Sequence, residues 1–119
     1  MDRNRRKELQ EAYKEIKTMM GVVQITNKLN GKRFIDSYPN LKNKWSTLKM
    51  QLNIGMFPNP GLQTDWKKSG VEAFEFEILE EKEVKEDTDA RWEIKQMEKY
   101  WLEQIQPFGD NGYHKQVKS

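Results

Sequence analysis

Side chains suited to catalysis are sparse in this sequence of 119 residues. It contains no cysteine, which excludes disulfide bonds, thiolate zinc sites and cysteine nucleophiles. His114 is the single histidine, so a metal site with several histidines and a Ser-His-Asp triad are both poor hypotheses. Basic residues form two short clusters, Lys28/Lys32/Arg33 and Lys67-Lys68, whose chemistry would be contact with phosphate. Clusters this short are also common on ordinary surfaces.

The charged residues are unevenly divided along the chain, although the net charge is only +2. Residues 1–70 contain 14 Lys/Arg and 6 Asp/Glu, whereas residues 71–119 contain 7 and 13, giving +8 and −6. A basic half and an acidic half suggest one face for a polyanion and another that repels it. A solvated surface with uneven charge explains the same numbers equally well.

Length and composition predict one soluble domain. Hydrophobic residues make up 35% of the chain, and its 4 Trp, 4 Tyr and 5 Phe argue against disorder. No apolar run approaches the roughly 18 residues that a membrane span needs, and the charged N-terminus is unlike a signal peptide. We therefore expect a cytoplasmic protein without a membrane partner.

The segments that must position any site begin with an amphipathic helix, predicted over residues 2–20. Its apolar stripe is formed by Leu9, Tyr13 and Ile16. A helix of this kind needs a surface to pack on, so it should either dock on the rest of the chain or pair with its copy in a homodimer. We divide the chain accordingly into residues 1–20 and a domain over residues 21–119.

The other segments alternate between strand and helix patterns. Residues 22–26 and 32–36 have strand composition, and the Asn-Gly step between them suits a hairpin turn. Residues 74–79 alternate apolar and acidic side chains, as in a strand with one buried face. Helices are predicted over residues 41–52 (capped by Asn40), 61–68 and 89–104. The pattern predicts an α+β fold, a small sheet flanked by helices.

Four tryptophans lie at the spacing of helix faces that pack on a core. We interpret them as packing residues, with stacking on nucleic-acid bases as the alternative: Trp45, Trp66, Trp92 and Trp101. In the last predicted helix, Met97 and Ile105 are expected to face the core as well.

Taken together, several segments resemble the GIY-YIG nuclease family, in order and with sensible gaps over residues 20–114. The matching segments are Gly21-Val22-Val23 with the turn that follows, Phe34-Ile35-Asp36-Ser37, Asn40–Trp45, Asn59–Trp66 with Gly70, Phe74–Glu80, and Glu98–Leu102. The resemblance implies a small three-stranded antiparallel sheet flanked by helices, and it leaves the helix at 2–20 as an N-terminal addition. It also implies metal-dependent hydrolysis of DNA, with Mg²⁺ as the ion of an active member.

By this resemblance, four positions of the chain correspond to the catalytic residues of the family, and three of the four are substituted. Val23 stands where one tyrosine would help to activate water and has no ionisable group. Phe34 keeps the ring of the second tyrosine without its hydroxyl. Lys44 keeps the positive charge of the family's arginine but cannot donate the two parallel hydrogen bonds with which a guanidinium binds one phosphate. Glu98 matches the glutamate that holds the divalent ion, although a surface glutamate is the common alternative on such an acidic helix.

Three further positions depart from the family pattern. Asp36 replaces a glycine near the expected phosphate, and Leu48 replaces a polar residue one helical turn after the arginine position. His114 corresponds to a polar residue, usually Asn, that completes the site; a lone histidine near a terminus is otherwise most often a surface residue.

Three functions remain open from the sequence. The first is a DNA-binding protein with little or no nuclease activity, making non-specific phosphate contacts. Its contacts would come from Lys28, Lys32, Arg33, Lys42, Lys44, Lys49, Lys67 and Lys68. The second is a Mg²⁺-dependent DNA endonuclease with a rewired site built from Glu98, Asp36, Tyr38 and His114. The third is a regulatory or adaptor protein that binds another protein through its outer helices.

Overall fold

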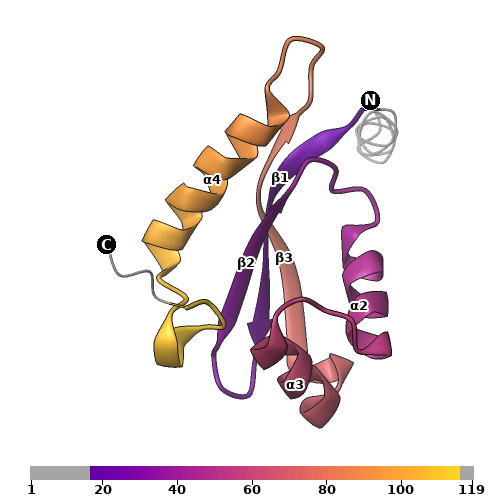
Figure 1. Ribbon diagram of the computed structural model, residues 1–119, viewed down its shortest axis with the longest axis vertical. Helices are drawn as coiled ribbons and strands as arrows, with labels where there is room; N and C mark the ends of the chain where they lie inside the picture. The colour runs from indigo at the N-terminus through magenta and orange to yellow at the C-terminus, as the bar shows by residue number, and fades with distance from the viewer. Residues whose placement is uncertain (1–16, 116–119) are drawn as a thin grey trace, which may run out of the picture.

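The computed structural model describes residues 17–115, and this part of the chain forms one antiparallel sheet flanked by helices (Figure 1). The strands β1 (Met19–Asn27), β2 (Arg33–Tyr38) and β3 (Phe74–Glu83) lie in the order β2-β1-β3. The helices are α2 (Lys44–Ile54), α3 (Pro60–Ser69) and α4 (Ala90–Ile105), with short 3-10 turns at Val71–Ala73 and Gly109–Asn111. The predicted α+β class with a three-stranded antiparallel sheet is confirmed.

The first two strands form the predicted hairpin. The amide of Asn27 donates to the carbonyl of Lys32 at 2.8 Å, and the amide of Gly31 donates back to the carbonyl of Asn27 at 2.8 Å. Gly31 has φ 76°, a left-handed conformation that glycine adopts at little cost. The turn therefore sets the register in which Ile25 faces Phe34 and Val23 faces Asp36.

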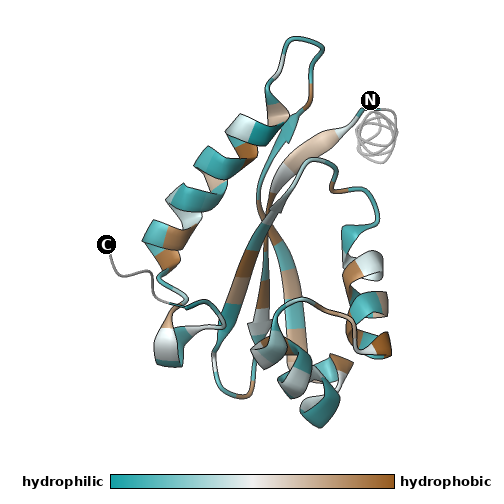
Figure 2. Ribbon diagram, in the orientation of Figure 1, coloured by the Kyte–Doolittle hydropathy of each residue, from teal (hydrophilic) through white to brown (hydrophobic). Residues whose placement is uncertain are grey.

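The central strand is buried because helices cover both faces of the sheet. α4 packs on β1 and β2, whereas α2 and α3 lie on the other side (Figure 1). The core on the α2 and α3 side consists of Ile25, Phe34, Leu48, Leu52, Phe57, Leu62, Trp66, Ala73 and Phe74. Figure 2 shows hydrophobic colour on the strands and hydrophilic colour over much of α4. Trp66 is part of this core and Trp45 packs against it, as predicted.

The N-terminal boundary differs from the prediction. Met19 and Met20 belong to β1 rather than to a helix: Met20 is fully buried and pairs with Lys82 of β3. The amide of Val84 also donates to the carbonyl of Thr18 at 2.8 Å. Hydrogen bonding to β3 and to the residue after it therefore makes residues 18–20 extended rather than helical. Residues 1–16 lie outside the described part of the chain, and the docking helix predicted there stays a prediction.

Two other predictions were wrong in detail. Helix α2 begins three residues later than expected, and Asn43, with φ 54°, precedes it in place of Asn40. The side chain of Asn40 instead accepts the amide of Lys42 at 3.0 Å. Trp92 was expected in the core and is 59% exposed, because α4 turns Ile94 toward the sheet.

β3 extends to Glu83, four residues beyond the predicted strand. Along it, Glu75, Glu77 and Glu81 are exposed, so this edge of the sheet is acidic. Gln106, with φ 56°, ends α4, and the chain then returns to β2 as a C-terminal tail, residues 107–115. Within residues 17–115, no helix is long and apolar enough to cross a membrane.

Candidate functional site

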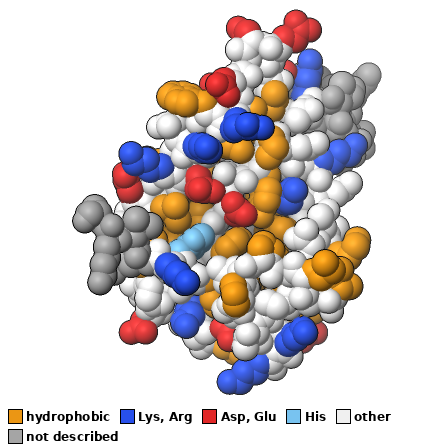
Figure 3. Space-filling view, in the orientation of Figure 1, with side chains coloured by type: hydrophobic (Ala, Val, Ile, Leu, Met, Phe, Trp, Pro, Cys, Tyr) orange, Lys and Arg blue, Asp and Glu red, His pale blue; other side chains and the backbone are white. Residues whose placement is uncertain are grey.

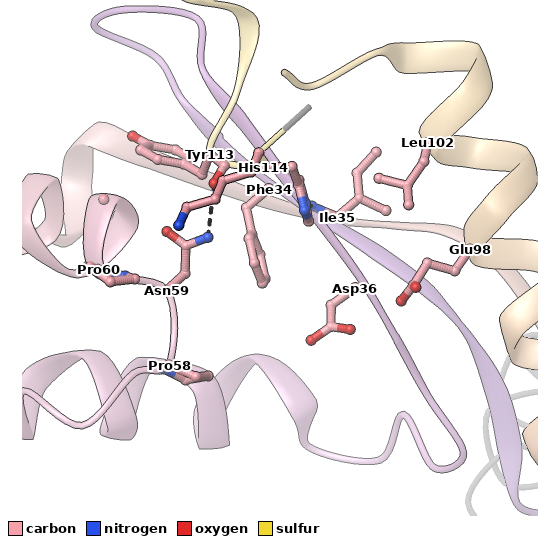
Figure 4. A pocket seen from close by; sticks show the side chains of 12 residues that line it. Phe34, Ile35, Asp36, Pro58, Asn59, Pro60, Glu98, Leu102, Tyr113 and His114 are labelled. Carbon is pink, nitrogen blue, oxygen red and sulfur yellow. Dashed lines mark hydrogen bonds between the residues drawn. The ribbon is translucent and has the colours of Figure 1, made fainter. Parts of the chain in front are cut away.

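A cavity of about 560 Å³ opens beside β2, between α4, the loop before α3 and the C-terminal tail (Figure 4). β2 contributes Phe34 and Asp36, α4 contributes Glu98, and the tail contributes His114. In Figure 3 acidic, basic and hydrophobic side chains gather around the histidine on this face of the molecule. The structure therefore brings together four positions that the family resemblance had singled out from three separate segments.

Asp36 and Glu98 form a pair of carboxyl groups at one end of the cavity (Figure 4). Ser37 connects them: its amide donates to Oδ1 of Asp36 at 2.8 Å, and its hydroxyl donates to Oε1 of Glu98 at 2.9 Å. Burial raises the pKa of Glu98 above its ordinary value, and the negative charge of Asp36 raises it further, although the Ser37 hydroxyl opposes both. The pair is thus a concentration of negative charge that favours a proton or a cation.

His114 is held against β2 through its ring. The amide of Ile35 donates to Nε2 at 2.9 Å, and the imidazole stacks on the Phe34 ring with centroids 5.1 Å apart and planes 5° apart. Burial lowers the pKa of His114 below its ordinary value, although Asp36 opposes the shift. Since Nε2 accepts a hydrogen bond, the ring is neutral and carries its proton on Nδ1.

Tyr113 fixes the tail that carries this histidine. Its hydroxyl donates to Oδ2 of Asp65 at 2.7 Å and accepts from Nδ2 of Asn27 at 3.0 Å. Its carbonyl accepts from Nδ2 of Asn59 at 3.0 Å, the contact drawn in Figure 4. Burial raises the pKa of Tyr113 to about 12, with the Asp65 carboxylate contributing. Three segments of the chain thereby hold the residue next to His114.

The two positions of the family tyrosines are apolar and buried. Val23 lies in the middle of β1 with no exposed surface, and it does not line the cavity. Phe34 is 6% exposed, with its ring between His114 and Phe57, whose ring centroid is 5.3 Å away. Neither position offers a group that could donate or accept a proton.

Lys44, at the arginine position, lies outside the cavity lining. Its Nζ is 4.3 Å from the centroid of the Tyr38 ring, a cation–π geometry. Burial, followed by the charge of Asp36, raises the pKa of Tyr38 well above its ordinary value, so this phenol stays protonated. Asp36, Glu98 and His114 therefore converge on the cavity, whereas Lys44 and Tyr38 form a neighbouring contact.

The eight residues predicted to contact DNA belong to three segments. Lys28, Lys32 and Arg33 lie on or beside the β1–β2 turn; Lys42, Lys44 and Lys49 lie before and within α2; Lys67 and Lys68 lie in the last turn of α3. Lys32 approaches the site, with Nζ 5.8 Å from the ring centroid of Tyr113, whereas Nζ of Lys49 lies over the Trp45 ring at 5.4 Å.

Sequence reasoning missed three polar residues that line the cavity: Asn59, Tyr113 and Lys115. An available signal for Asn59 was its position before Pro60, typical of a helix cap, and its side chain does accept the amide of Leu62 at 3.0 Å. The burial of Tyr113 depends on contacts with residues far away in sequence, which no local pattern reveals.

The residues present are compatible with the divalent ion that the family resemblance implies. Among the described residues there is no cluster of three or more His, Asp or Glu side chains that could enclose a metal. Mg²⁺, however, is usually bound by one or two carboxylates together with waters and substrate phosphates. Asp36 and Glu98, which line the same cavity, meet this requirement.

Comparison with solved structures identifies the class of fold. The catalytic domain of the homing endonuclease I-TevI is 30% identical, with a TM-score of 0.63, over 79% of this chain and 95% of that domain. A variant of the I-TevI catalytic domain with one glutamate replaced by alanine is 27% identical, with a TM-score of 0.65, over 81% of this chain and 92% of the domain. No protein-family model and no curated protein matches the sequence. The fold is that of a nuclease catalytic domain.

With 30% identity over nearly the whole of that domain, the relationship extends beyond the fold. The chain belongs to the GIY-YIG nuclease family.

Proposed function

We propose that this protein is a DNA-binding member of the GIY-YIG family with little or no nuclease activity. The observation that carries the proposal is the burial of Val23 and Phe34, two apolar residues at the positions of the family's tyrosines. Loss of a positioned proton-transfer group commonly costs about 10²–10⁴-fold in rate. Lys44, engaged with the Tyr38 ring, also lacks the bidentate geometry of an arginine.

DNA is the proposed partner because the matched solved structures are catalytic domains of an endonuclease. The basic residues of the β1–β2 turn and of α2 support this proposal, since they would contact phosphates rather than base edges. Binding of this kind is non-specific and weakens with salt, with a dissociation constant of about 10⁻⁴–10⁻⁶ M at physiological ionic strength.

A second candidate is a Mg²⁺-dependent DNA endonuclease with a rewired site. It is favoured by the convergence of Asp36, Glu98 and His114 on one cavity. Asp36 and Glu98 would hold the ion, which would supply charge stabilisation for a phosphodiester, and neutral His114 would take part in proton transfer. The same carboxylate pair is present in both candidates.

A nicking assay distinguishes the two. Supercoiled plasmid is incubated with the full chain and Mg²⁺ or Mn²⁺, and the I-TevI catalytic domain serves as the positive control. We expect no metal-dependent nicking at concentrations where the control is complete. Nicking by this chain that disappears in Glu98→Ala would reject the proposal and establish the rewired enzyme.

Restoration of the family residues tests why activity is absent. The quadruple variant Val23→Tyr, Phe34→Tyr, Asp36→Gly, Lys44→Arg should recover more activity than any single change, because such groups act as a unit. A tyrosine at the fully buried Val23 overpacks the centre of the sheet, so the variant's near-UV circular dichroism is measured alongside.

A further inference from the structure

A groove of about 170 Å³ lies between the start of β1, β3 and the segment before α2. Met19 of β1, Ile78 of β3 and Leu41 form its apolar surface. The polar residues of its lining are Lys17, Asn40, Lys42 and Glu81. The groove shares no lining residue with the cavity beside β2, and it lies where the described part of the chain begins.

Ile78 is more exposed than its place in the sheet predicts. Successive residues of a strand alternate between the two faces, so Ile78 shares a face with Phe74 and Phe76. Phe74 is buried in the core, and the ring of Trp45 stacks on Phe76 with centroids 5.0 Å apart. Ile78, two residues further along β3, is 44% exposed. Helix α2 begins at Lys44, so the core face of the sheet is left partly open beyond Trp45.

Residues 1–16 join the described chain at this groove. Lys17 lines the groove, and its Nζ lies 3.8 Å from Oε1 of Glu83 at the end of β3. The segment before Lys17 therefore starts from the wall of the groove. A segment joined directly to a binding surface reaches it at a high effective concentration, without the entropy cost of bringing two molecules together.

The sequence of this segment predicts an apolar stripe of matching length. Leu9 and Ile16, with Tyr13 between them, lie on one face of a helix and span about 10 Å along its axis. The distance along β1 from Met19 to the residue opposite Ile78 is four strand residues, or about 13 Å. One helix face is therefore long enough to cover the apolar part of the groove.

Charge favours the same pairing. Residues 3–7 contain four basic side chains and no acidic one, whereas β3 contains five glutamates and one lysine. Arg5 and Arg6 lie four and three residues before Leu9, so on a helix they continue the same face by one turn. Basic residues at a helix N-terminus oppose the helix dipole, and an acidic surface beside them offsets this cost.

A second exposed apolar groove suits the segment less well. It lies over α2 and the 3-10 turn that follows α3, and it is lined by Ser46, Lys49, Met50, Asn53, Ile54 and Val71. None of these lining residues is acidic, and the charged residues of α2 are Lys44 and Lys49. The basic residues 3–7 would meet charges of their own sign there.

We propose that residues 2–16 form a helix whose apolar stripe packs into the groove of the same chain, over Leu41 and Ile78. The helix completes the cover of the sheet face that α2 leaves open. Its basic first turns then lie beside the acidic β3. The inference does not rest on the proposed DNA-binding function, because it involves no nucleic acid.

A paramagnetic label measures the position of the segment in the full chain. The sequence contains no cysteine, so Lys7→Cys accepts one nitroxide at a defined place, on the helix face opposite the apolar stripe. We expect strong broadening of the backbone amide resonances of Leu41 and Ile78, and much less at Met50 and Val71 in the second groove. The reverse pattern, or no broadening at any of the four, would overturn the proposal.

Variants of the segment separate docking from the nearness of a tethered tail. Leu9→Ser combined with Tyr13→Ser, in the labelled chain, removes the stripe and should reduce the broadening at Ile78 severalfold. Glu11→Ser combined with Lys14→Ser alters the opposite face without changing the net charge, and it should leave the broadening unchanged. Equal broadening in the two variants would contradict docking, because the tether alone would then explain it.

A variant of the groove provides the complementary measurement. Ile78→Lys places a charge on the apolar surface and should reduce the broadening at Leu41. Ile54→Lys, at a residue of α2 that is 62% exposed, is the matched control and should not. If Ile78→Lys loses the dispersion of a folded spectrum, the stripe variants decide the matter, because their changes lie outside residues 17–115.

A mixed sample distinguishes one chain from two. Spin-labelled chains without isotope enrichment are mixed with enriched chains without the label, so that only contacts between copies cause broadening. We expect none at Leu41 or Ile78. Broadening there as strong as in the singly labelled sample would overturn packing within one chain and would indicate that two copies exchange the helix.

Discussion

Tyr113 connects three parts of the molecule through one side chain and one carbonyl. Asp65 and Asn27 hold its hydroxyl, and Asn59 holds its carbonyl. The next residue is His114, whose ring closes one side of the cavity. A tyrosine outside the family's catalytic set therefore determines where a cavity residue lies.

The variant Tyr113→Phe should destabilise the fold by about 1–3 kcal/mol, because Asp65 and Asn27 lose a partner in a partly buried position. Urea denaturation at neutral pH measures this change. Tyr100→Phe, at a tyrosine of α4 that is 52% exposed, is the matched control and should change stability little. Equal stability of the two variants would show that the Tyr113 hydroxyl is not an anchor.

The same residue predicts a pH dependence. The pKa of Tyr113 is raised to about 12 from an ordinary value of 10.0. The folded state therefore holds this proton while the unfolded state releases it, so stability is retained below about pH 10 and falls as the pH rises toward 12. In Tyr113→Phe this part of the alkaline loss should be absent. Urea midpoints at pH 8 and pH 11, with phenolate absorbance recorded in parallel, measure the difference.

At the scale of elements, the C-terminal tail completes the site by pairing with the edge of β2. The amide of Tyr113 donates to the carbonyl of Arg33 at 3.0 Å, and the amide of His114 donates to the carbonyl of Pro107 at 3.1 Å. Gly112 allows the tail to pass close to the backbone of Pro107, because a Cβ at this position would collide with that backbone.

Gly112→Ala should therefore displace the tail. We expect a loss of stability of about 1–3 kcal/mol, the usual range for overpacking, and a shift of the His114 imidazole resonances in the NMR spectrum. Gly109→Ala is the matched control: its φ of 58° costs about 1 kcal/mol or more for a non-glycine residue, but nothing lies within 4 Å of its Cβ. Unchanged His114 resonances in Gly112→Ala would contradict the close contact between Gly112 and the backbone of Pro107.

Sequence patterns identified the elements better than their ends. The strand pattern of residues 74–79 and the helix around Trp101 were predictable because alternation and helical spacing are local properties. Met19 and Met20 continued an apolar helical spacing, and only pairing with β3 decides that they are strand. The start of α2 depends on the left-handed backbone of Asn43, which no residue pattern specified.

The candidate site was predictable as a list of positions rather than as an arrangement. The family resemblance pointed to Asp36, Glu98 and His114, and all three line the cavity. Their convergence depends on the packing of α4 on β2 and on the returning tail, contacts between residues far apart in sequence. Ser37, which joins the two carboxyl groups, carried no signal of its own, because a lone serine in a strand is unremarkable.

At the scale of the whole molecule, the uneven charge of the sequence maps onto different elements. The basic residues 28–68 occupy the β1–β2 turn, α2 with the segment before it, and α3, whereas acidic residues outnumber basic ones in β3 and in the loop after it. α4 contains three of each. A polyanion should therefore approach over the turn and α2 rather than along β3.

Charge reversal tests this orientation. Lys32→Glu combined with Lys44→Glu should weaken duplex binding and reduce the slope of log affinity against log salt by about 2. Lys85→Glu combined with Arg91→Glu, after β3 and at the start of α4, changes the net charge equally and should leave the slope nearly unchanged. Fluorescence anisotropy at several salt concentrations provides both slopes. Equal losses in the two variants would indicate a net-charge effect without a preferred face.

In the strand order β2-β1-β3, β2 and β3 are the outer strands, and their outer edges are protected in different ways. β2 is bridged by the tail at Arg33 and Gly112, whereas β3 presents Glu75, Glu77 and Glu81 to solvent. Charged side chains on an outer strand keep it from pairing with the same strand of another molecule. Replacement of these three glutamates by glutamine would remove that repulsion. The protein should then become prone to edge-to-edge assembly through β3, the beginning of a fibre.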